Sequence, residues 1–221
     1  MKQLFQDPKR KTVEVDEVPP PALRPGCLLV QTCFSAISPG TERANVQAVR
    51  GSFLRTARNR PDLVRRVVEV VKTRGVLAAY QAVQQKLSTL QPLGYSSAGT
   101  VLEIGEGAGD YFQVGDRVAC AGKGFASHAE MVCVPVNLVA KVPASVSMEH
   151  AAFSTLGSIA LHGVRQGEPQ LGDRVAVVGL GMLGLLIVQV LRAHGARVAA
   201  FALQHEAVDR ALKLGAEVGA A

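Results

Sequence analysis

The chain has 221 residues, of which 48% are hydrophobic and 19% are charged. This composition supports a buried core and excludes global disorder. Tryptophan is absent and aromatic residues make up 5% of the chain, which argues against an aromatic stacking surface for single-stranded nucleic acid. The length suits one large domain or two modest ones.

The formal net charge of +6 is concentrated in one segment. Residues 43–90 contain ten Lys and Arg residues and two acidic residues, so this segment carries +8 and the rest of the chain −2. Apolar residues recur there at helical spacing, which predicts a helical insertion with basic outer faces. The simplest interpretation is a solvated amphipathic surface. The alternative is a binding face for nucleic acid or for another anionic surface.

Neither the N-terminal sequence nor the cysteines indicate export. The start, MKQLFQDPKRKTVEV, lacks the apolar segment of a secretory signal, so we expect a cytoplasmic protein. The uncharged run 175–191 is better explained by a strand and a helix than by a membrane span, so no membrane partner is expected. Cys27, Cys33, Cys120 and Cys133 include no Cys-x-x-Cys pair, which predicts free thiols.

The first half of the chain is predicted to form short strands separated by glycine and proline turns, an arrangement typical of a small β-barrel. These strands are expected around residues 12–15, 27–33, 99–104, 114–119 and 129–134. Helical signals begin at Ser147, a residue type that caps helix N-termini well.

The last part of the chain alternates between strand and helix patterns. We predict strands over 174–178 and 197–201 and helices over 182–194 and 205–214. This β-α-β-α order is the opening of a parallel sheet. Two parallel strands would leave their apolar faces poorly covered. We therefore expect either a fragment of a longer enzyme, or a partner that completes the sheet, such as a second copy in a homodimer.

A glycine motif joins the first of these strands to the helix that follows it. Its six residues are Gly179, Leu180, Gly181, Met182, Leu183 and Gly184. Glycines at this spacing permit a tight turn, close approach of a pyrophosphate and close packing of helix on strand. The helix N-terminus would then hold the anion. The motif therefore predicts dinucleotide binding.

The end of the second strand bears on the choice of dinucleotide. An acidic residue there would bond the ribose 2′-hydroxyl of NAD, but the corresponding residue is Ala202. NADP is therefore favoured and NAD is the alternative. Gln204, His205 and Arg210 are candidate contacts to a 2′-phosphate, although ordinary solvated side chains would explain these residues equally well.

With these motifs, the layout resembles the medium-chain dehydrogenase/reductase family, the zinc-type alcohol dehydrogenase-like proteins. The matching segments are residues 115–118, 124–130, 151–152, 175–184 and 214–216. The resemblance implies an α/β protein with a GroES-like β-barrel domain over residues 1–145, carrying the helical insertion. It also implies a partial Rossmann domain, a doubly wound parallel sheet, over residues 146–221.

The zinc ligands of that family have no counterparts here. Ser38 stands at one ligand position, the Gly-His-Glu motif becomes Gly94-Tyr95-Ser96, and the third position falls near Leu156. Zinc prefers thiolate, imidazole or carboxylate ligands. We therefore predict no catalytic zinc.

Without a metal, hydride transfer to a carbonyl needs a hydrogen-bond donor for the developing negative charge. Tyr95 is a candidate by position, and Thr41 matches the family's proton-relay hydroxyl, while Ser38 and Glu42 would complete a polar cluster. A structural role is the alternative for Tyr95, as is a surface position for Glu42. His128 is expected to be structural.

The favoured function is a zinc-independent NAD(P)-dependent oxidoreductase that acts on a carbonyl, alcohol or activated alkene of a small molecule. The position of the basic insertion suggests that it faces an anionic substrate or the phosphates of the cofactor. One alternative is a protein that binds nucleic acid or an anionic surface through the insertion on an inactive dehydrogenase scaffold, although nucleic acid is the less favoured partner. Another is an inactive remnant that folds only with a partner.

Overall fold

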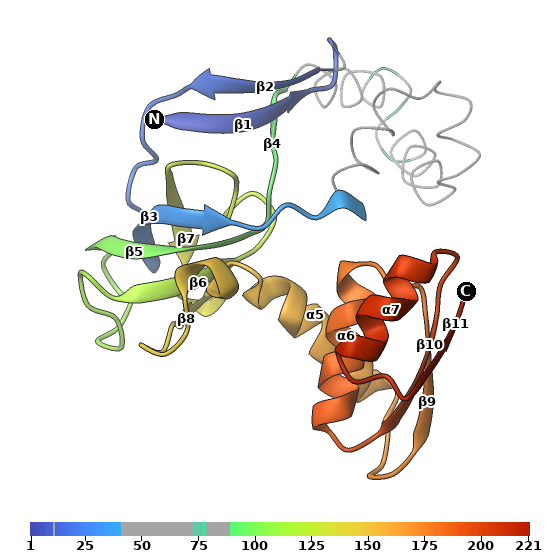
Figure 1. The fold of residues 1–221 in the computed structure, drawn as a ribbon. Coiled ribbons are helices and arrows are strands. Elements are labelled where there is room, and N and C mark those ends of the chain that lie inside the picture. The colour runs from blue at the N-terminus through green and yellow to red at the C-terminus, as the bar shows by residue number, and fades with distance from the viewer. Residues whose placement is uncertain (11, 41–72, 74, 76, 78–88) are drawn as a thin grey trace. The chain divides into compact units, whose positions relative to one another are not determined.

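The structure is a computed structural model that describes residues 1–10, 12–40, 73, 75, 77 and 89–221. It divides into two compact units, Met1–Glu149 and His150–Ala221 (Figure 1). We call the first the curled-sheet unit and the second the parallel-sheet unit. The insertion predicted over residues 43–90 lies almost wholly outside the described residues.

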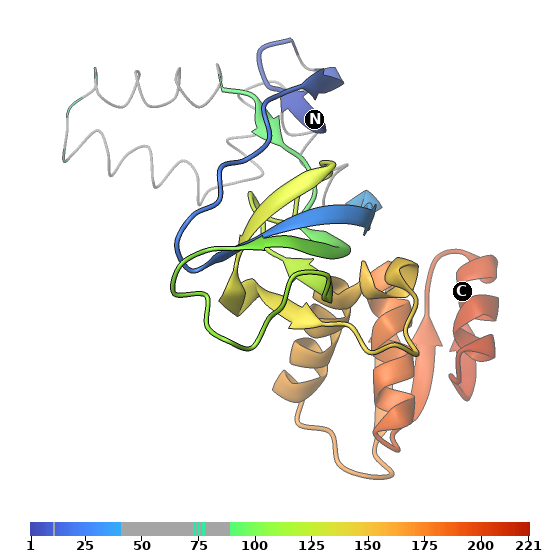
Figure 2. The same ribbon diagram turned by 90° about the vertical axis from the view of Figure 1, so that its left-hand side faces the viewer.

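The curled-sheet unit contains a five-stranded antiparallel sheet in the order β7-β3-β5-β6-β8, which Figure 2 shows curling around its interior. Its strands are β3 (Cys27–Ser35), β5 (Ser96–Ile104), β6 (Arg117–Ala121), β7 (Met131–Pro135) and β8 (Val139–Lys141), and the short 3-10 helix η1 (Val136–Leu138) precedes β8. A smaller antiparallel sheet has the order β2-β1-β4, with β1 (Lys2–Asp7), β2 (Thr12–Glu17) and β4 (Gln91–Pro92).

Side-chain alternation along these strands builds the core of the unit. In β3, Leu28 and Val30 are 0% and 1% exposed and join Val132 and Val134 of the neighbouring β7 in one apolar cluster. Successive side chains of a strand point to opposite faces. Cys27 and Cys133 are not members of this cluster and therefore belong to the other face of the sheet.

The parallel-sheet unit alternates strictly between helix and strand. Its elements are α5 (Ser154–Gln166), β9 (Arg174–Val178), α6 (Met182–Ala193), β10 (Arg197–Phe201), α7 (His205–Lys213) and β11 (Val218–Ala220), and the short helix α4 (Met148–Ala151) crosses the boundary between the units. The three strands are parallel and have the order β11-β10-β9. The third strand was not predicted, because its three residues include a glycine and carry no alternating pattern.

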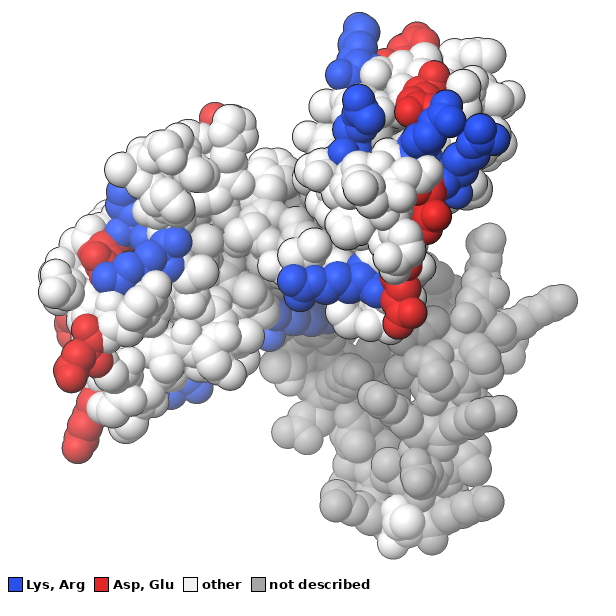
Figure 3. Space-filling model, turned by 90° about the horizontal axis from the view of Figure 1, so that it is seen from below, with Lys and Arg blue, Asp and Glu red and all other residues white. Residues whose placement is uncertain are grey.

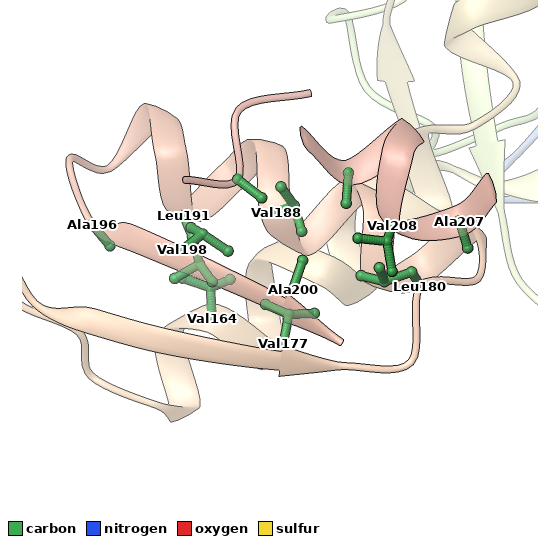
Figure 4. Packing of buried hydrophobic residues seen from close by; sticks show 12 residues of the cluster. Val164, Val177, Leu180, Val188, Leu191, Ala196, Val198, Ala200, Ala207 and Val208 are labelled. Atoms are coloured by element: carbon green, nitrogen blue, oxygen red, sulfur yellow. The ribbon is translucent and has the colours of Figure 1, made fainter. Parts of the chain in front are cut away.

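Within the described part of this unit, helices cover one face of the parallel sheet and leave the other exposed. Helices α6 and α7 pack on the same face, where Val177, Val198 and Ala200 meet Val188 and other buried residues (Figure 4). On the opposite face Val178 is 82% exposed and Val218 is 61% exposed. Among the described helices, none combines the length and apolar character that a membrane crossing requires.

Candidate functional site

The glycine loop (residues 179–184) connects β9 to α6 as the sequence predicts. Gly179 has a φ of +93°, a conformation that favours glycine, and its N–H donates to the carbonyl oxygen of Phe201 at 2.8 Å. A Cβ placed on Gly184 would overlap the carbonyl oxygen of Gly179. Gly184 therefore lets the first turn of α6 lie directly against the end of β9.

Gly181, like Gly179 and unlike Gly184, faces open space. It is the N-cap of α6, and a Cβ placed there would meet no atom within 4 Å. The first N–H groups of a helix have no acceptors within the helix, and its N-terminus carries partial positive charge. The loop therefore offers an accessible backbone surface beside a helix N-terminus, which fits a diphosphate group.

The structure places the candidate contacts to a 2′-phosphate at different distances from the end of β10. Ala202 follows β10 directly, and Gln204 is the N-cap of α7, where its side chain is exposed. His205 begins the helix. Arg210 lies five residues after His205 in α7, about 7.5 Å further along the helix axis at the usual rise per residue. Gln204 and His205 are therefore closer to the end of β10 than Arg210 is.

In the curled-sheet unit, two of the predicted catalytic residues lie at the same end of paired strands. Ser35 is paired with Ser97, and the N–H of Ala36 donates to the carbonyl oxygen of Ser96 at 2.9 Å. Ser38 follows β3 and is 7% exposed, while Tyr95 directly precedes β5 and is half-buried. Thr41 and Glu42, the other two candidates, lie outside the described residues.

The structure adds a histidine to this end of the sheet. His128 Nδ1 and Ser35 Oγ are 2.8 Å apart and form a hydrogen bond between residues 93 positions apart in the sequence. The backbone N–H of His128 donates to Leu93, next to Gly94 and Tyr95, at 2.8 Å. No local pattern identifies this pair, because the bond depends on how distant strands are placed.

The residues at the three positions predicted to correspond to zinc ligands do not have the side chains that bind zinc. Ser38 and Ser96 supply hydroxyl groups, and Leu156 is an apolar side chain, 4% exposed, in α5. Within the described part of the chain, no group of three or more His, Cys, Asp or Glu residues is placed to hold a metal ion. These donors do not fit a zinc ion, so no chemical step is derived through one.

Charges on the described surface are mixed. On the face that Figure 3 shows, Lys and Arg side chains lie among Asp and Glu side chains on both units. The described residues also form ion pairs, such as Lys141 with Asp116 at 2.7 Å and Arg197 with Glu217 at 2.8 Å. The described surface therefore presents no single-sign field on that face.

Comparison with known proteins identifies relatives of the chain, although no family model matches it. It is 33% identical over 151 residues to (R,R)-butanediol dehydrogenase of Bacillus subtilis, which covers 56% of this chain and 42% of that protein. It is 34% identical over 128 residues to a probable quinone oxidoreductase of Schizosaccharomyces pombe, covering 57% of this chain and 39% of that protein. The chain thus spans about two-fifths of the length of these curated relatives.

Solved structures show the same fold. Galactitol-1-phosphate dehydrogenase from Escherichia coli matches with a TM-score of 0.74 at 19% identity, over 99% of this chain and 60% of that one. The 2R,3R-butanediol dehydrogenase from Bacillus subtilis matches with a TM-score of 0.72 at 23% identity, over 98% and 62%. The predicted GroES-like and Rossmann fold is confirmed. The homologues and structural neighbours of this chain are medium-chain dehydrogenases and reductases of the zinc-type alcohol dehydrogenase and quinone oxidoreductase group.

Proposed function

We propose that this chain forms part of an NAD(P)-dependent oxidoreductase and that it binds the dinucleotide at the glycine loop. The observation that carries the proposal is the packing of Gly184 on Gly179, which holds the loop against β9 while Gly181 stays open at the N-terminus of α6. A nicotinamide dinucleotide presents a diphosphate that this arrangement can bind through backbone N–H groups. The names of the relatives, dehydrogenases and quinone oxidoreductases, support this class of reaction.

The proposed reaction is a zinc-independent hydride transfer to or from a carbonyl, alcohol or activated alkene of a small molecule. A bound nicotinamide supplies or accepts the hydride. Negative charge then develops on the substrate oxygen, where the Tyr95 phenol donates a hydrogen bond in place of a metal ion. Ser38 and the hydrogen-bonded pair of Ser35 and His128 lie at the same end of the curled sheet and provide polar groups for proton movement.

NADP is the proposed dinucleotide. The chain has an alanine, Ala202, where a carboxylate would favour NAD, and Gln204 and His205 follow it at the start of α7. NADPH is therefore expected to bind more tightly than NADH, as measured by titration of cofactor fluorescence. Tighter binding of NADH would contradict this preference without affecting the proposed site.

The binding site is tested with matched glycine variants. In Gly181→Ala the new methyl group enters the open space at the N-terminus of α6, so the fold should persist while NADPH affinity falls by about tenfold or more. Gly157→Ala in α5 is the control, because a Cβ there also meets no atom within 4 Å. Equal NADPH affinity in both variants and the unsubstituted chain would overturn the proposed site.

The role of Tyr95 requires a separate measurement. The assay follows NADPH oxidation with a substrate that the protein reduces at a measurable rate. Tyr95→Phe should lower kcat in this assay by about a hundredfold, because one hydrogen-bond donor to the developing oxyanion is lost. NADPH affinity should change much less than kcat, since the glycine loop proposed to bind the diphosphate does not include Tyr95. An unchanged kcat would show that the phenol is structural.

A further inference from the structure

A histidine in the loop before β7 joins separate segments of the curled-sheet unit. The N–H of His128 donates to the carbonyl oxygen of Leu93 at 2.8 Å, and the carbonyl oxygen of His128 accepts the N–H of Leu4 at 2.9 Å. Leu4 belongs to β1, while Leu93 follows β4 and precedes Gly94 and Tyr95. The backbone of His128 is therefore bonded both to β1 and to the segment that carries Tyr95.

The side chain of His128 reaches the end of β3. Its Nδ1 lies 2.8 Å from Ser35 Oγ, and Ser35 is the last residue of that strand. A hydroxyl group can donate or accept, so this hydrogen bond can form in both tautomers of the neutral ring and in the imidazolium. Ser38, which is 7% exposed, follows three residues later. The bond therefore ties the His128 ring to the segment that leads to Ser38.

The same ring packs against the residue before Tyr95. Gly94 has a φ of +94°, a conformation that favours glycine. A Cβ placed there would lie 2.9 Å from Cγ of the His128 ring and 2.6 Å from the backbone nitrogen of His128. Separations this short leave no room for a side chain at residue 94. Gly94 therefore allows the His128 ring to lie directly against the backbone that carries Tyr95.

The residues on either side of Gly94 are held by further bonds. The carbonyl oxygen of Tyr95 accepts the N–H of Gly122 at 2.9 Å, and that of Ser96 accepts the N–H of Ala36 at 2.9 Å. Together with the contacts of His128, these bonds join each residue of the stretch 93–96 to another part of the chain. The half-buried side chain of Tyr95 thus starts from a backbone whose place depends on His128.

We propose that His128 is a positioning residue for Tyr95. Its bond to Ser35 and its packing on Gly94 hold the end of β3 and the segment before β5 at a fixed separation, which fixes the Tyr95 phenol. This inference rests on the proposed function, in which that phenol donates a hydrogen bond to the developing oxyanion. Such a donor is effective only at the correct position, because a displacement of about 1 Å can cost about a hundredfold in rate.

The first test compares two substitutions of His128 in the NADPH oxidation assay. His128→Leu removes Nδ1 and keeps a bulky side chain, so kcat should fall about tenfold while NADPH affinity stays within about twofold. His128→Asn places an amide group near the position of Nδ1, where it can still bond Ser35, so kcat should stay within about threefold. If His128→Leu keeps full kcat, or if His128→Asn loses as much as His128→Leu, the bond to Ser35 does not position Tyr95.

A second histidine provides the matched control. The ring of His194 forms a hydrogen bond with the carbonyl oxygen of Pro169 at 3.0 Å, and both residues belong to the parallel-sheet unit. His194→Leu removes a histidine hydrogen bond of similar length and should leave kcat unchanged. A fall in kcat equal to that of His128→Leu would show that the loss is not specific to His128, and the proposal would be wrong.

The same substitution in the Tyr95→Phe background separates positioning from a general structural effect. If His128 acts through the phenol, adding His128→Leu to Tyr95→Phe should change kcat by less than about twofold, because both substitutions remove the same contribution. A further tenfold loss in the double variant would show that His128 acts independently of Tyr95, and this would overturn the proposal.

The last test needs neither cofactor nor turnover. The chain has three tyrosines, so labelled tyrosine rings give few NMR signals, and Tyr95→Phe identifies the signal of Tyr95. Ser35→Ala removes the bond but keeps the His128 ring, so it should shift or broaden the Tyr95 signal and leave that of the exposed Tyr111 unchanged. An unchanged Tyr95 signal would overturn the positioning role. A shifted signal together with full kcat in Tyr95→Phe would support positioning and overturn only the proposed role of Tyr95 in the reaction.

Discussion

The antiparallel sheet of the curled-sheet unit buries its apolar side by curling on itself, whereas the parallel sheet of the other unit depends on helices to cover it. In the first, Leu28, Val118 and Val134 are all fully buried by residues of the same unit. In the second, α6 and α7 bury Val177 and Val198, and the opposite face stays exposed. A sheet that curls completes its core locally, while a flat layer needs a second covering layer.

The largest expected effect concerns the apolar core of the curled-sheet unit. Leu28→Ala removes a side chain that is 0% exposed, so it should lower the free energy of unfolding of the curled-sheet unit by about 4 kcal/mol through lost burial and a cavity. Chemical denaturation provides the measurement. Leu203→Ala, at a leucine that is 100% exposed, should change stability by less than about 0.5 kcal/mol. Similar losses in both variants would show that burial does not distinguish these positions.

The next effect concerns the contact between helix and strand in the parallel-sheet unit. Gly184→Ala forces a methyl group onto the carbonyl oxygen of Gly179 and should cost about 2 to 3 kcal/mol of stability. Gly157→Ala, in open space within α5, should be neutral or slightly stabilising. Thermal unfolding of the two variants checks this difference. If Gly184→Ala is as stable as the unsubstituted chain, the helix does not pack on the strand as closely as described.

A smaller effect, dependent on pH, belongs to the curled-sheet unit. Lys141, 2.7 Å from Asp116, and the N–H of Gln113 hold the pKa of Asp116 below its ordinary value of 3.8. A lowered pKa in the folded state contributes stability that is present above pH 3.8 and is lost as pH falls through the folded-state pKa. Asp116→Asn should therefore flatten the dependence of unfolding on pH below about 4. Asp110→Asn, at an exposed carboxylate, is the control and should leave the slope unchanged.

The smallest expected effect lies on the uncovered face of the parallel sheet. Val178 is 82% exposed, so Val178→Lys should change the free energy of unfolding by less than about 0.5 kcal/mol. Val177→Ala, one residue earlier and 7% exposed, should cost about 2 kcal/mol. Denaturation at two protein concentrations checks both. A large, concentration-dependent cost of Val178→Lys would mean that another molecule covers this face in solution.

Sequence patterns predicted the regular parts of the fold because those parts depend on neighbouring residues. The strands expected over 174–178 and 197–201 are confirmed as β9 and β10, each a run of small and β-branched residues between turn signals. The glycine loop lies between strand and helix as its spacing predicts. The short β1 and β11 were missed, since their pairing partners rather than their own composition hold them in place.

Long-range contacts explain what the sequence could not predict about the site. The bond between Ser35 and His128 joins residues 93 positions apart, and His128 was expected to have only a structural role. The four cysteines were expected to be free thiols, and the structure confirms this while placing them in different surroundings.

The junction of β3 and β5 has a consequence for engineering. The pairing of Ser35 with Ser97 and the bond from Ala36 to Ser96 join the places where the chain leaves the five-stranded sheet and returns to it. The register of β3 and β5 therefore rests on residues outside segment 43–90, which carries the net positive charge of the chain. Exchanging the basic residues of segment 43–90 would therefore change the net charge of the molecule without altering any residue of that junction.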